Sequence, residues 1–104
     1  AKDAETFLLK LPEIVANFGN CSILLYQAGA DPHVNDPLGG WMTTEQLQHR
    51  DRIVFDGAKR IGLPVAWDLA GGYQRDERGN ISPVLEIHRN TMQECIAAYV
   101  APKP

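Results

Sequence analysis

The sequence is poor in the residues that mark several large classes of proteins. It has only two cysteines and three histidines in 104 residues, and 8% of its residues are aromatic. Its lysines and arginines are scattered and its formal net charge is -3, so it lacks the basic stripe of a protein that binds nucleic acid directly. No apolar run approaches the roughly 20 residues that span a bilayer, so we expect no membrane segment. The hydrophobic share of 44% is ordinary for one small globular domain.

The cysteines and histidines do not form a recognisable redox or metal site. Cys21 and Cys95 make no Cys-x-x-Cys pair and both lie in apolar patterns, so we expect reduced thiols in the core of a cytoplasmic protein. His33, His49 and His88 are not spaced as a cluster of ligands. We expect His49 on a solvated helix face and His88 in the core with a hydrogen bond.

Apolar side chains recur every three or four residues in three segments, which is typical of helices. These segments are 4–18, 47–61 and 82–99. Within the first, Pro12 predicts a kink or the start of a second helix. Before the second, Thr43 and Gln46 have the spacing of a capping box. At the third, Ser82 and Pro83 have the character of an N-cap and a first helical residue.

Two apolar runs between these segments have the character of strands. Cys21–Tyr26 is apolar on both faces, as expected of a buried parallel strand, and Leu63–Leu69 follows the second helical segment. Asp68, inside the second run, requires a buried partner or an opening to solvent. The resulting order α-β-α-β-α predicts a layered α/β fold with parallel strands.

Two parallel strands make a poor sheet in isolation, because their outer edges remain unpaired. We therefore expect the sheet to continue in sequence outside this chain. The same open sheet predicts that the chain associates, either with that missing part or as an oligomer.

Polar groups follow each strand, at the edge where open α/β sheets place their chemistry. Asp31 comes after the first strand, and its carboxylate could bind zinc or cap the turn that Pro32 begins. Tyr73 comes after the second strand and two glycines. Its phenol could donate a hydrogen bond to a carbonyl oxygen, or it could be a surface side chain. His33 is close enough to Asp31 to lie at the rim of such a site.

Taken together and in order, these residues resemble the histone deacetylase superfamily. Tyr26–Asp31 followed by Asn35–Gly40 looks like the family's zinc-ligand loop, and Ala70–Tyr73 is similar to its glycine-rich loop with the catalytic tyrosine. The helix Leu47–Ile61 fits the element between them. The Leu-Gly-Gly of the first loop is closest to bacterial deacetylase-like proteins and class IV-type enzymes.

The resemblance implies a fold, a reaction and roles for individual residues. It implies that residues 1–104 are the C-terminal part of an arginase-like α/β fold that hydrolyses acyl-amide bonds, such as those of acetyl-lysine or acetylated polyamines, at Zn²⁺. Asp31 would be one of three zinc ligands, and Tyr73 would stabilise the oxyanion. Leu38 would line the acyl channel, and Gly71 and Gly72 would shape its floor.

One departure from the family pattern is large. The family's Asp-x-His ligands and its tandem histidines, which lie upstream of this segment in the family, are not found here. Because a catalytic zinc normally has three protein ligands, we expect the segment alone to be inactive and to depend on the remainder of the domain. A non-catalytic interaction module that keeps the fold is the alternative. A phospho-accepting signalling domain is a weaker one, because it would want an acidic pair and a late lysine that are not found.

Overall fold

The chain folds into three helices and two strands in the order that the sequence predicts. The structure is a computed structural model and describes residues 2–100. Its elements are α1 (Lys2–Ala16), β1 (Leu24–Gln27), α2 (Thr44–Arg60), β2 (Val65–Asp68) and α3 (Ser82–Tyr99). The strands pair in parallel, with Leu24 opposite Val65 and Gln27 opposite Asp68. The predicted α/β architecture with parallel strands is confirmed.

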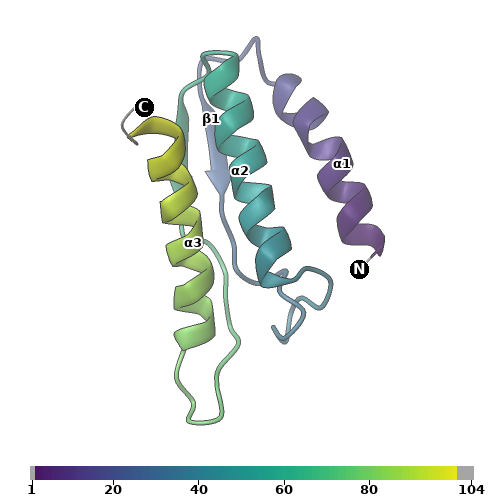
Figure 1. The fold of residues 1–104 in the computed structure, drawn as a ribbon, viewed down its shortest axis with the longest axis vertical. Coiled ribbons are helices and arrows are strands. Elements are labelled where there is room, and N and C mark those ends of the chain that lie inside the picture. Colours follow the sequence, from purple (N-terminus) through teal and green to yellow (C-terminus); the bar gives the residue numbers. More distant parts are fainter. Residues whose placement is uncertain (1, 101–104) are drawn as a thin grey trace.

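All three helices lie on the same side of the two strands (Figure 1). Helix α2 is in the middle and packs against both α1 and α3. Tyr26 of β1 meets Phe55 of α2 edge to face, with ring centroids 5.8 Å apart. The result is a two-layer arrangement in which α2 is the central support of the sheet.

The other face of the sheet is bare, and this corrects the expectation of a strand buried on both faces. Leu25 of β1 is 74% exposed, and Ala66 and Asp68 of β2 are exposed as well. The strand is apolar on both faces, but the described residues provide helices for only one of them. Asp68 therefore has an opening to solvent and needs no buried partner.

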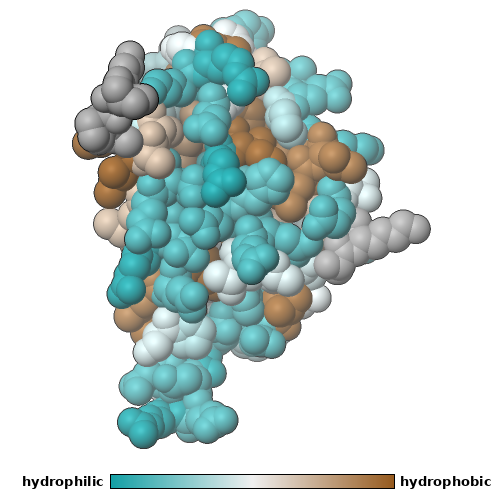
Figure 2. Space-filling view, in the orientation of Figure 1, coloured by the Kyte–Doolittle hydropathy of each residue, from teal (hydrophilic) through white to brown (hydrophobic). Residues whose placement is uncertain are grey.

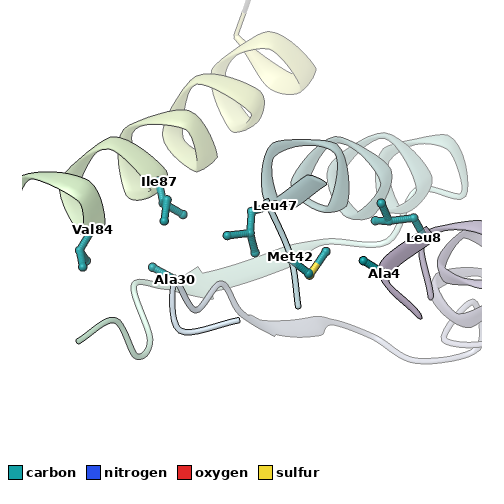
Figure 3. Close-up of a cluster of buried hydrophobic side chains, with 7 residues drawn as sticks. All are labelled: Ala4, Leu8, Ala30, Met42, Leu47, Val84 and Ile87. Carbon is teal, nitrogen blue, oxygen red and sulfur yellow. The ribbon is translucent and has the colours of Figure 1, made fainter. Parts of the chain in front are cut away.

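Two clusters of apolar side chains fill the space between the layers. The first is drawn in Figure 3 and consists of Ala4, Leu8, Ala30, Met42, Leu47, Val84 and Ile87. The second consists of Leu11, Val15, Leu24, Val54, Ala58 and Leu63. Phe55, which is fully buried, also makes edge-to-face contacts with Trp67 and Tyr99. Every helix contributes to this core, and it reaches the loop that follows β1 through Ala30.

The helix ends agree with the sequence at α2 and differ at α3, and α1 contains its proline without ending there. Thr43 and Gln46 form the predicted capping box, with side-chain to backbone distances of 3.1 and 2.9 Å. Helix α1 continues through Pro12, so no second helix starts there. The buried apolar stripe on both sides of Pro12 offsets the backbone hydrogen bond that proline cannot make. Helix α3 begins one residue early, with Ile81 as N-cap and Pro83 in the first turn.

The surface on the helical side is mostly hydrophilic, with hydrophobic patches over α1 and beside α3 (Figure 2). Within residues 2–100, no helix has the length and apolarity to cross a membrane. Both cysteines are free thiols, as expected. The expectation that both lie in the core is wrong for Cys21, which is exposed just before β1.

Truncation of Leu47 should destabilise the chain far more than truncation of Leu9, because only Leu47 is buried (0% against 82% exposed). We expect Leu47→Ala to lower the free energy of unfolding by about 2–5 kcal/mol, through lost burial and the cavity left behind. Leu9→Ala, the same change on an exposed helical position, should stay within about 0.5 kcal/mol. Urea unfolding measures both, and equal losses would contradict this account of the core.

Candidate functional site

The loops that follow the two strands stay hydrogen-bonded to each other beyond the sheet. The backbone N–H of Ala28 donates to the backbone carbonyl of Asp68 at 3.1 Å, and that of Ala30 donates to the backbone carbonyl of Gly71 at 2.7 Å. Ala30 also packs beneath α3, facing Val84 and Ile87 (Figure 3). The carboxyl ends of β1 and β2 therefore deliver their loops to one place, as the sequence predicts for parallel neighbours.

Asp31 lies in the angle between these loops, with its carboxylate against two glycines. A Cβ added at Gly71 would be 2.7 Å from Asp31 Cγ, and one added at Gly29 would be 2.6 Å from Oδ1. The half-buried carboxylate accepts no hydrogen bond from residues 2–100, so it is not the cap of the turn at Pro32. A side chain at position 29 or 71 would displace this carboxylate, which is the movable end of the Asp31 side chain.

Asp36 holds the second half of the first loop against the second loop. Its buried carboxylate accepts hydrogen bonds from the backbone N–H groups of Tyr73 at 2.7 Å, Leu38 at 3.0 Å and Gln74 at 3.1 Å. Burial alone would raise the pKa of Asp36, but these three N–H donors together with His33 hold it below its usual value. Asp36 is therefore ionised near neutral pH. Its stabilisation is present above the usual carboxyl pKa and is lost as the pH falls through the lowered value.

Tyr73 and Leu38 both face solvent. The Tyr73 side chain is 54% exposed and that of Leu38 is 70% exposed. The Tyr73 phenol makes no hydrogen bond within the described part of the chain, whereas the backbone of both residues is fixed by Asp36. Gly72 fits tightly between the layers, since a Cβ there would be 2.8 Å from Val84 Cγ1. The structure thus brings Asp31, Gly71, Gly72, Tyr73 and Leu38 to one edge of the sheet.

A buried polar network supports the loop after β1 from the side of α2. Arg50 Nη1 donates to the carbonyl of Gly29 at 2.8 Å, and Arg50 Nε donates to Asp51 Oδ1 at 3.0 Å. Arg50 Nη2 lies 2.9 Å from the same oxygen, but off the direction of a hydrogen bond, so that contact is ionic. Tyr26 and Thr91 both donate their hydroxyl groups to Asp51. The guanidinium thus ties α2 to the turn that carries Asp31.

Burial dominates the protonation of the groups around this network. It raises the pKa of Tyr26, with Asp51 acting in the same direction and Arg50 against it. Burial lowers the pKa of His88, and here Arg50 adds to the effect and Asp51 opposes it. His88 is buried as predicted, but its Nδ1 has no hydrogen-bond partner, contrary to the expected hydrogen bond. Both side chains are therefore neutral near pH 7.

The network was missed in the sequence, although the helical spacing contains it. Arg50 and Asp51 follow Leu47 by three and four residues and precede Val54 by four and three. They therefore occupy the buried stripe of α2, where charged side chains require partners. Reading that stripe for charges as well as for apolar residues would have found them.

Both ring nitrogens of His33 lie against polar groups of the chain. His33 is buried, its Nδ1 accepts from the backbone N–H of Asn35 at 3.1 Å, and its Nε2 is 2.9 Å from the Thr44 hydroxyl. It lines an open hollow of about 660 Å³ together with Gln74 and Glu86. Burial lowers the pKa of His33, with Asp36 and Glu86 opposing it. No group of three or more His, Cys, Asp or Glu side chains in residues 2–100 is arranged to hold a metal ion.

Comparison with known proteins gives two matches. A family model described as the histone deacetylase domain matches residues 4–85, which include both loops and end in the first turns of α3. An uncharacterized protein of Picosynechococcus sp. is 40% identical over 68 residues. That alignment covers 64% of this chain but 23% of the relative, so the chain spans about a quarter of the relative's length.

Removal of the Tyr26 hydroxyl should cost more stability than removal of the Tyr99 hydroxyl. Both rings contact Phe55, but Tyr26 donates to the buried Asp51 carboxylate and Tyr99 donates to a backbone carbonyl at 3.3 Å. We expect Tyr26→Phe to lower the free energy of unfolding by about 1.5–3 kcal/mol and Tyr99→Phe by no more than about 1 kcal/mol. Chemical denaturation of both variants tests this, and a reversed order would refute the role given to the network.

Proposed function

The chain belongs to the histone deacetylase family, and on that premise we propose that it forms the C-terminal part of a zinc-dependent deacetylase. In this proposal, residues 1–104 supply one zinc ligand and the tyrosine that stabilises the oxyanion. The substrate is an acyl-amide of the acetyl-lysine or acetylpolyamine type. One observation carries the proposal. At the carboxyl ends of two parallel strands, the Asp31 carboxylate, which has no hydrogen-bond partner in residues 2–100, lies beside the loop Gly71–Tyr73.

The surroundings of Asp31 fit one position in a zinc site. The carboxylate is half-buried, accepts no hydrogen bond from residues 2–100, and lies close to Gly29 and Gly71, where an added Cβ would contact it. When bound, zinc supplies polarisation of the substrate carbonyl and activation of water. Because the described residues provide no three-ligand group, the remainder of the deacetylase domain must supply the other ligands and the general base.

Tyr73, Leu38 and the two glycines act on the substrate in the proposal. The Tyr73 phenol is exposed and free of hydrogen bonds within the described residues, so it can donate to the carbonyl oxygen as charge develops there. Leu38 offers an exposed apolar wall for the acyl channel. The backbone of Gly71 and Gly72 would form the floor of that channel, with Gly71 beside Asp31 and Gly72 against Val84.

The bare face of the sheet supports a role for the remainder of the domain as the chain's partner. Leu25 and Ala66 are exposed there, and both strands have an unpaired outer edge in residues 2–100. We propose that the missing part of the domain covers this face, with a second copy of the chain as the other possible occupant. The free thiols of Cys21 and Cys95 support a cytoplasmic location.

A non-catalytic interaction module remains the second candidate. The absence of a three-ligand group from residues 2–100 favours it if the longer protein also lacks the other ligands. Zinc content and hydrolysis by that longer protein separate the two candidates.

In the complete protein, Asp31→Ala should remove bound zinc and lower kcat/KM for an acetyl-lysine peptide by at least about 100-fold, because a catalytic zinc depends on each of its three protein ligands. Asp56→Ala, which removes an exposed carboxylate of α2, is the matched control and should leave both unchanged. Zinc is measured by elemental analysis, and chelation followed by zinc readdition should abolish and restore the wild-type activity. An unchanged zinc content in Asp31→Ala would sink the ligand assignment.

The isolated 104-residue chain should neither hydrolyse acetyl-lysine peptides or acetylated polyamines nor hold zinc tightly. The reason is that one carboxylate cannot replace three ligands. A chromogenic hydrolysis assay and equilibrium dialysis against zinc test the two parts. Robust hydrolysis by the purified chain would mean that the other groups lie within it after all.

A further inference from the structure

Asp36 is placed between the two surfaces that the proposed reaction needs. One carboxylate oxygen accepts from the backbone of Leu38, and the other accepts from the backbone of Tyr73 and Gln74, over distances of 3.0, 2.7 and 3.1 Å. The first contact is local to its own loop, and the other two cross to the loop after β2. Asp36 thereby links the wall formed by Leu38 to the segment that carries the phenol.

Backbone bonds from Gly39 to Asp36 at 3.1 Å and from Gly40 to His33 at 3.0 Å fix the first loop around Leu38, but none of the described backbone bonds crosses from that loop to residues 72–75. Leu38 and Tyr73 lie outside the helices and strands, and both side chains are exposed. The backbone bond from Ala30 to Gly71 joins the loops at their base, two residues before Tyr73. Beyond that point Gly72 packs against Val84, and the hydrogen bonds that join the two loops within residues 2–100 are those of the Asp36 carboxylate.

The chemistry of the contact requires a carboxylate. Three backbone N–H groups converge on two oxygens, and an ionised acceptor makes these bonds roughly twice as strong as neutral ones. Asp36 is only 5% exposed and forms no ion pair with a lysine or arginine of residues 2–100, so its charge is balanced chiefly by these donors. Asparagine has the same shape, but its NH₂ group would face at least one N–H and leave it unpaired.

We propose that Asp36 is a positioning residue, which holds the backbone of Tyr73 beside Leu38 so that the phenol meets the substrate carbonyl. The proposal rests on the proposed deacetylase function, because it assigns Asp36 an effect that is exerted through Tyr73. Asp36 touches no substrate itself. Its loss should therefore lower kcat more than it raises KM and leave the zinc content unchanged, since the Asp36 carboxylate bonds to the backbone of Leu38, Tyr73 and Gln74 and not to Asp31.

A double-mutant cycle in the complete protein tests the proposal. Tyr73→Phe should lower kcat about 10²–10³-fold, the range for loss of one oxyanion donor. Asp36→Asn should lower kcat by at least about 10-fold in the wild-type background, but by less than about 3-fold when Tyr73 is already phenylalanine. Such non-additivity is the mark of two residues that act together, whereas general destabilisation would add equally in both backgrounds.

Asp76→Asn is the matched control for this cycle. Asp76 also accepts backbone N–H groups, from Arg78 and Asn80 at 2.9 Å each, but these lie within its own exposed turn. The Asp76→Asn substitution should therefore leave kcat unchanged. Hydrogen exchange of the peptide spanning residues 71–75 gives a readout without catalysis, and it should accelerate in Asp36→Asn and stay as in the wild type in Asp76→Asn.

The possible results separate failure of the positioning role of Asp36 from failure of the proposed deacetylase function. If the wild type is active, Tyr73→Phe is impaired, and Asp36→Asn is additive or without effect, the positioning role is overturned while the proposed function stands. If the complete wild-type protein holds no zinc and hydrolyses nothing, the proposed function fails and the positioning role fails with it. If Asp36→Asn does not fold, Asp36→Glu keeps the charge but shifts it by one methylene. The same non-additive loss is then expected, and additivity again overturns the role.

Discussion

The parallel register of β1 and β2 is the constraint on which the rest of the structure depends. It places Gln27 opposite Asp68, and the backbone bond from Ala30 to Gly71 extends the alignment past the last strand residues. That bond brings the carboxylate of Asp31 within van der Waals reach of Gly71. A slip of one residue would turn Tyr26 away from α2 and carry Asp31 away from the glycine that makes room for it.

The buried network of α2 explains how a short two-stranded sheet keeps this register. Arg50 donates a hydrogen bond to the carbonyl of Gly29, and Asp51 accepts hydrogen bonds from the hydroxyl groups of Tyr26 in β1 and Thr91 in α3. A buried ion pair of this kind is weak evidence for added stability, because desolvation offsets most of the attraction. Its directional bonds can still specify one arrangement of strand and helix over others that bury a similar apolar area. We regard Arg50 and Asp51 as residues that specify the position of the Asp31 turn, rather than as the main source of folding free energy.

Much of the fold could be predicted because local signals agree with it. The capping box at Thr43 and the glycine after α2 mark helix ends in terms that depend on nearby residues alone, and the order of elements follows. The bare face of β1 could not be predicted, since Leu25 is apolar like Leu24 and the sequence does not say which face the helices cover. In the site, the location of Asp31 and Tyr73 at one edge of the sheet follows from their positions after the two strands, while their roles stay predictions that the family resemblance implies. Asp36 does not, because its part depends on backbone N–H groups more than thirty residues away, and an Asp-Pro step by itself predicts only a turn.

The incompleteness of the sheet and that of the proposed zinc site have one physical origin. In a parallel sheet, every strand brings its carboxyl end to the same edge, and β1 and β2 each contribute one polar group there, Asp31 and Tyr73. Within residues 2–100 both strands have an unpaired outer edge, which is a site for a further strand. A parallel strand added at either edge would deliver the residues after it beside Asp31 or beside Tyr73. The pairing that would satisfy the open backbone groups is therefore also the pairing that could supply the missing ligands, so the stability of the sheet and the assembly of the site should be acquired together.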